Sequence, residues 1–99
     1  MNEEQIAFLK GYDFMRLGQA IAHGQWQSAA MAVRRMEMKA KELEMGEFAR
    51  PLGNLRLIIM RKEEVQAKQI LSMITAKRVQ LLNRYVYGGS ISRKGEGNE

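Results

Sequence analysis

The sequence has no cysteine, one proline and one histidine among its 99 residues. Without cysteine, no disulfide and no thiolate nucleophile is possible, so the fold has to rest on a hydrophobic core. A single histidine excludes zinc sites of the usual cysteine and histidine types. Because proline interrupts helices, its near absence permits long helical segments.

The sequence also lacks long apolar runs. None approaches the roughly 20 residues that a helix needs to span a bilayer. The segment Met1 to Glu4 is acidic, whereas a secretory signal is basic at this position. We therefore expect a cytoplasmic protein with no membrane association.

Charge of one sign does not accumulate in any segment. The formal net charge is +5, yet Arg34 and Arg35 are followed by Glu37, and the other basic residues are mixed with glutamate in the same way. Mixed signs are typical of a solvated helix surface, whereas nucleic-acid binding favours a basic stripe.

Residue combinations that carry catalysis are missing as well. His23 has no glutamate at the spacing of a di-iron site and no serine at helical spacing. The carboxylates of the presumed helices have basic neighbours, and none falls in an apolar seam where burial would raise its pKa: Glu37, Glu42, Glu44, Glu63 and Glu64. We expect no enzymatic activity and no cofactor.

The sequence does have apolar residues at helical spacing. In the clearest segment, 25–45, they recur at steps of three and four, which predicts an amphipathic helix with one buried seam: Trp26, Ala29, Val33, Met36, Ala40 and Leu43. A helix over 2–22 precedes it, with a capping box between Asn2 and Gln5 and an end at His23 and Gly24. Gly11 and Gly18, seven residues apart in that helix, predict close approach of a neighbouring helix.

Pro51 makes the next boundary the hardest to place. Its ring disfavours helical angles at Arg50, so the second helix should end near Gly46. A third helix should then begin between Glu47 and Pro51 and run to about Arg61, although a kinked continuation of the second helix stays open. A fourth helix is predicted over about 64–85.

Four amphipathic helices joined by short connections predict an all-α fold, an antiparallel up-and-down four-helix bundle. Residues 1–87 should form this single domain. Residues 88–99 have four glycines and almost no apolar content, so we expect a disordered tail there.

Two methionines of the second helix fall outside its apolar seam. Met31 and Met38 align with Arg34 and Lys41 on the opposite side. Exposed methionine is adaptable enough to favour partner surfaces, so these four residues predict a protein-docking strip. The alternative is that the bundle wraps further round and half-buries both methionines.

The order of features from Leu17 to about Tyr85 resembles the histidine-containing phosphotransfer (HPt) domain of bacterial phosphorelays. The resemblance rests on helix lengths and on a series of marker residues: Gly24-Gln25-Trp26, Leu43, Phe48, Leu55 and the junction 61–65. In that family the phosphorylated histidine belongs to a pattern His-x-x-Lys-Gly-Ser/Ala-Ala about two helical turns beyond the Trp-like position.

The same resemblance implies that phosphotransfer has been lost. It places Arg34 at the histidine, Glu37 at the lysine, Met38 at the glycine and Lys39 at the small polar residue, with only Ala40 kept. A guanidinium cannot accept a phosphoryl group.

The docking strip of Met31, Arg34, Met38 and Lys41 would lie where the HPt family meets receiver or kinase domains. The resemblance therefore implies an adaptor or antagonist, in which Arg34 addresses the acidic pocket of a receiver.

Two other interpretations stay open. A nucleic-acid or anionic-surface binder would use basic residues of the second and fourth helices: Arg34, Lys41, Lys77, Arg78 and Arg84. A structural homodimer would bury Met31 and Met38 between protomers, with or without Met73.

Overall fold

The computed structural model describes residues 1–87. These residues form five α-helices and one π-helical turn, and no strand: α1 (Glu3–Lys10), α2 (Asp13–Ala22), α3 (Trp26–Glu42), α4 (Gly46–Met60), α5 (Glu64–Leu82) and η1 (Asn83–Tyr87). No helix in this part of the chain combines the length and the hydrophobicity needed to cross a membrane. The tail predicted over 88–99 lies outside the described residues.

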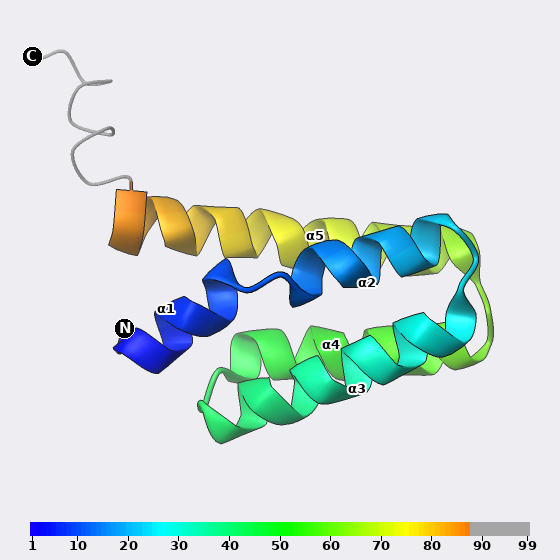
Figure 1. Cartoon of the computed structure of the whole chain (residues 1–99), viewed down its shortest axis with the longest axis horizontal. Helices are drawn as coiled ribbons and strands as arrows, with labels where there is room; N and C mark the ends of the chain where they lie inside the picture. Colours follow the sequence, from blue (N-terminus) through cyan, green and yellow to red (C-terminus); the bar gives the residue numbers. More distant parts are fainter. Residues whose placement is uncertain (88–99) are drawn as a thin grey trace, which may run out of the picture.

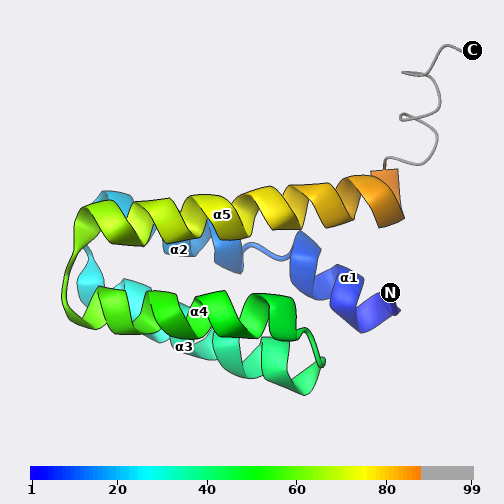
Figure 2. The same ribbon diagram turned by 180° about the vertical axis from the view of Figure 1, so that it is seen from behind.

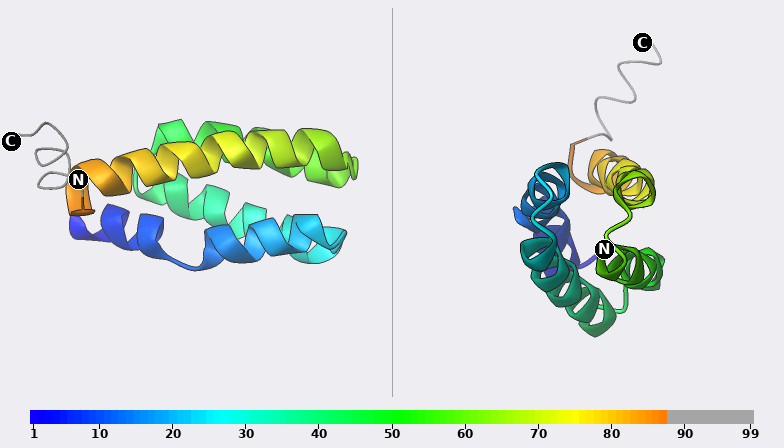
Figure 3. Two further views of the ribbon diagram at one scale, coloured as in Figure 1. Left: turned by 90° about the horizontal axis from the view of Figure 1, so that it is seen from above. Right: turned by 90° about the vertical axis from the view of Figure 1, so that its right-hand side faces the viewer.

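Helices α2, α3, α4 and α5 form an antiparallel up-and-down four-helix bundle, which confirms the predicted fold (Figure 1). Each helix packs on the one that follows it, and α5 packs back on α2. The reverse view shows α4 and α5 side by side along the back of the bundle (Figure 2). Seen end-on, the four helices form a ring in which α3 lies diagonally across from α5 (Figure 3).

The core follows the predicted seam of α3. Ala29, Val33, Met36 and Ala40 are buried there, while Trp26 is half-buried at the start of the helix. Towards the end of the bundle near α1, three phenylalanine rings from α1, α2 and α4 stack edge to face, with centroids 5.4 to 6.2 Å apart: Phe8, Phe14 and Phe48. Such aromatic pairs contribute about 0.5–1.5 kcal/mol each beyond the burial of their surface.

The prediction of one helix over 2–22 is wrong, because the helix is interrupted between α1 and α2. Gly11 has extended backbone angles, φ −69° and ψ 164°, instead of helical ones. The break leaves backbone carbonyls without helical partners, and the guanidinium of Arg78 on α5 donates to one of them, that of Leu9. The same guanidinium lies 5.1 Å from the centroid of the Phe14 ring, so α5 holds both sides of the break.

The predicted start of this segment is confirmed. Asn2 and Gln5 form the capping box, and the Gln5 amide also donates to the Leu43 carbonyl at 2.9 Å, which ties α1 to the end of α3. A Cβ added to Gly18 would lie 3.5 Å from a side-chain carbon of Leu71, an ordinary van der Waals contact, so α5 packs on α2 there without an approach that requires glycine. Gly11 instead marks the break.

All three turns between the bundle helices share one geometry. A left-handed residue follows each helix, at Gly24 (φ 68°), Glu44 (φ 58°) and Lys62 (φ 57°). The next N–H then donates to a carbonyl in the last helical turn, which is the Schellman motif, in the pairs Gln25 with Ala20, Met45 with Ala40, and Glu63 with Ile58. Only the glycine was predicted, because other residues disfavour this conformation.

The turn at Glu44 also corrects the boundaries around Pro51. The chain reverses direction there, so a kinked continuation of α3 into α4 is wrong. Helix α4 begins at Gly46, before the predicted window, and includes Pro51. The missing N–H of Pro51 deprives the Glu47 carbonyl of its partner. Glu47 is exposed in the first turn, so water can satisfy that carbonyl.

Candidate docking groove

The four residues of the docking strip lie on one exposed face of α3, as predicted. Met31 and Met38 are 63% and 58% exposed, so the alternative that the bundle half-buries them is wrong. Arg34 and Lys41 are exposed as well. From Met31 to Lys41 the face extends about 15 Å along the helix.

The structure places this strip along a groove between α3 and α4. The groove has a volume of about 620 Å³ and is lined by the strip together with four further residues: Ala30, Glu37, Arg56 and Met60. Met60 is 67% exposed. We call the eight residues the docking groove. Met60 has the same sequence signal as Met31 and Met38, since it is an apolar residue outside the buried seam of its own helix.

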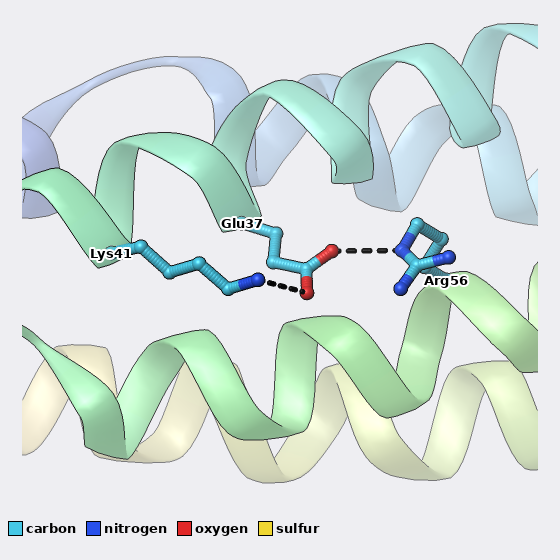
Figure 4. Close-up of polar contacts among 3 residues, drawn as sticks. All are labelled: Glu37, Lys41 and Arg56. Atoms are coloured by element: carbon cyan, nitrogen blue, oxygen red, sulfur yellow. Dashed lines mark hydrogen bonds and ion pairs between the residues drawn. The ribbon is translucent and has the colours of Figure 1, made fainter.

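Glu37 forms the floor of the docking groove, between a cation from each helix (Figure 4). One carboxylate oxygen accepts from Arg56 Nε at 2.8 Å, and the other lies 3.3 Å from Lys41 Nζ. Burial raises the pKa of Glu37, but the hydrogen bonds and the attraction from Arg56 and Lys41 outweigh this effect and lower the pKa below its usual value. The carboxylate is therefore charged at neutral pH.

The burial of Glu37 corrects a sequence prediction. No carboxylate was expected among buried residues, yet Glu37 is only 8% exposed. The reason lies on α4, where a Cβ added to Gly53 would lie 2.9 Å from a Glu37 oxygen. Because Gly53 has no side chain, α4 leaves room for the carboxylate. Glu37 has basic partners, but they are Lys41 and Arg56 and not Arg34 and Arg35, the cations that precede it in the sequence.

The docking groove carries more positive than negative charge. It contains three cations, Arg34, Lys41 and Arg56, and one carboxylate, Glu37. Lys41 and Arg56 share that carboxylate, whereas Arg34 has no ion-pair partner among residues 1–87. The surface thus combines exposed methionines with two uncompensated positive charges.

The structure does not gather the basic residues considered for nucleic-acid binding. Lys77 pairs with Glu47 at 3.4 Å, and Arg78 packs over Phe14. Both lie on α5, diagonally across the bundle from Arg34 and Lys41 on α3 (Figure 3). They therefore form no single basic stripe with the docking strip.

The same diagonal separates the methionines considered for a homodimer. Met73 is 67% exposed on α5, whereas Met31 and Met38 are exposed on α3. A homodimer interface over Met31 and Met38 would therefore leave Met73 outside it.

The other side chains considered for catalysis or metal binding form no site in the described part of the chain. His23 is exposed, and its ring Nδ1 lies 2.8 Å from the Gln19 carbonyl. Within residues 1–87, no three acidic or histidine side chains come close enough together to hold a metal ion.

Comparison with known proteins found no matching family model, no matching curated protein and no matching solved structure. The resemblance to HPt domains therefore stays a prediction from helix order and residue spacing.

Proposed function

We propose that this chain is a non-catalytic protein-interaction module whose docking groove binds an acidic surface of a partner protein. One observation carries the proposal: Met31, Arg34, Met38 and Lys41, singled out by their positions outside the buried seam, line a single groove. The groove adds a third exposed methionine, Met60, from the neighbouring helix.

The composition of the docking groove defines the chemistry of its partner. Methionine side chains are flexible and polarizable, so they adapt to apolar side chains of different shapes. The two uncompensated positive charges favour carboxylates beside those apolar groups, and they speed encounter with an acidic surface. A partner of this kind presents apolar side chains flanked by aspartate or glutamate.

A receiver domain is the partner that the HPt resemblance implies. Its phosphorylation pocket is acidic, and the resemblance aligns the exposed Arg34 with the family's histidine. Since a guanidinium cannot take up a phosphoryl group, the module would occupy the pocket without chemistry, as an adaptor or antagonist.

The test is a binding titration of the full chain against a panel of purified receiver domains, with histidine kinase domains as a second panel. Arg34→Glu should weaken binding at least tenfold, which is about 1.4 kcal/mol, because it sets a carboxylate against an acidic pocket. Arg50→Glu is the matched control, since Arg50 is exposed on α4 and does not line the groove. It should leave the affinity within about twofold, as expected for a residue outside the contact.

Equal effects of the two substitutions would show that net charge alone drives binding, and the proposal would fail. A DNA titration in the same buffer separates the nucleic-acid alternative. Binding that weakens steeply with added salt and does not depend on Met31 and Met38 would favour phosphate contacts over the groove.

A further inference from the structure

A second surface, on the opposite side of the bundle, is notable for the absence of charge. Between Gln69 and Gln80, every exposed residue of α5 is uncharged: Gln69, Ser72, Met73, Ala76, Val79 and Gln80. Met73 is 67% exposed and Val79 44%. We call these six residues the neutral face. On α3, by contrast, the exposed side includes Arg34, Arg35, Lys39, Lys41 and Glu42.

Helix α5 does contain cations in this stretch, but they point away from the neutral face. Lys77 reaches α4 and pairs with Glu47. Arg78 turns inward to the Phe14 ring and to the Leu9 carbonyl. The neutrality of the outer surface therefore follows from the placement of these residues.

The neutral face adjoins a shallow apolar groove between α2 and α5. The groove measures about 740 Å³, and most of its lining is small or apolar: Gly18, Ile21, Ala22, Leu71, Ser72, Thr75, Ala76 and Val79. The lining also includes one cation, Lys68, whose charge is paired with Glu64 at 2.6 Å. A Cβ added to Gly18 would lie 3.5 Å from a side-chain carbon of Leu71, so α2 and α5 pack together at this groove. Small residues here and at Ser72 allow another helix to approach the backbone of α5 closely.

We propose that the neutral face binds a second copy of this chain, with α5 packed against α5 in an antiparallel two-fold dimer. A two-fold contact sets the same patch of both copies against each other. For a chain with a net charge of +5, such a contact on the cationic side of α3 would oppose like charges. A two-fold contact on the neutral face buries Met73 and Val79 without setting like charges against each other. The antiparallel arrangement also places helix dipoles of opposite direction side by side.

This dimer differs from the one considered from the sequence, because it uses only Met73 of the three methionines. It is also independent of the proposed docking function, since no residue of the neutral face lines the docking groove.

Sedimentation velocity of the full chain over a concentration series tests the proposal. The wild-type chain should shift from monomer to dimer as its concentration rises. Ala76→Glu, at an exposed position, should raise the dissociation constant at least tenfold, about 1.4 kcal/mol, because it buries a carboxylate against its own copy. Gln27→Glu adds the same charge on exposed α3 and should leave the dimer unchanged.

A crosslink locates the contact. The sequence has no cysteine, so Met73→Cys introduces a single thiol near the middle of the neutral face. A disulfide requires Cα atoms within about 7 Å. Oxidation should therefore link Met73→Cys chains covalently, while Gln27→Cys chains should form no disulfide between copies. A wild-type chain that remains monomeric throughout, or a dimer that both glutamate variants affect equally, would overturn the proposal.

Discussion

Replacing Glu37 with glutamine would test whether the carboxylate under the docking groove stabilises the fold. The amide keeps the shape and can still accept from Arg56, but it removes the charge and turns an NH₂ group towards Lys41. Hydrogen bonds to charged groups contribute about 1.5–3 kcal/mol each. The cations are 37% and 66% exposed, so water can solvate them after the change. We therefore expect a loss of about 1–2 kcal/mol, below the 3–5 typical of a fully buried pair.

Thermal unfolding at neutral pH, followed by circular dichroism, measures this loss. For a domain of this size it corresponds to a melting temperature lower by roughly 5–12 °C. Glu64→Gln is the matched control, since Glu64 pairs with Lys68 at the same helical spacing as Glu37 with Lys41, but with both side chains about half exposed. An exposed pair of this kind contributes about 0.3–0.5 kcal/mol. Equal losses in the two variants would refute a structural role for the carboxylate.

Wild type and Glu37→Gln should also differ in how their unfolding free energies depend on pH. The pKa of Glu37 is lowered in the folded chain, while an unfolded glutamate titrates near a pKa of about 4.3. The unfolded state therefore binds the proton more tightly, so the stabilisation is complete above that value and is lost as the pH falls through the lowered pKa. The difference in unfolding free energy between wild type and Glu37→Gln should be constant near neutrality and shrink in acid. A difference that grows in acid would contradict this sign.

Three further substitutions test other features. Glu44→Gly should raise the unfolding free energy by roughly 0.5–1 kcal/mol in urea denaturation, because glycine relieves the left-handed strain at the end of α3; an unchanged midpoint would argue against strain there. Gly53→Ala should stabilise the fold by about 1 kcal/mol, through higher helix propensity, in a Glu37→Ala background, where the carboxylate that the new Cβ would meet is absent. The same stabilisation in the wild-type background would refute that contact. Arg78→Gln should increase amide hydrogen exchange in α1 about tenfold relative to α3, and uniform exchange in both helices would count against the anchoring role of Arg78.

The elements that could be predicted from the sequence are those defined by local pattern. The α3 seam, the capping box of Asn2 and Gln5, and the glycine turn after α2 each depend on residues a few positions apart, and all three are confirmed. The break at Gly11 could not be predicted in this way, because Arg78, which satisfies the freed Leu9 carbonyl, is distant in the sequence. Nor does the sequence mark the left-handed turns at Glu44 and Lys62, which use residues other than glycine.

In the candidate site, too, the residues defined by local pattern could be predicted and those defined by helix packing could not. Met31 and Met38 could be recognised because they depart from the periodicity of their own helix. The role of Glu37 depends on which part of α4 lies opposite it. Gly53 and Arg56 meet it only once the two helices pack at one particular register, and no pattern within α3 defines that register.

The diagonal arrangement of α3 and α5 has a consequence for valency. Because α3 lies diagonally across the bundle from α5 (Figure 3), two copies joined through α5 would carry their α3 helices away from the contact. Neither docking groove would then be covered by the other copy. A partner that is itself dimeric, with a linker long enough to reach around, could then occupy both grooves at once. The second contact would form within the assembly, which can raise overall avidity by about 10²–10⁴ over a single contact. A weak contact at each groove would then be enough for a long-lived complex, and binding would respond to the concentration of the chain itself.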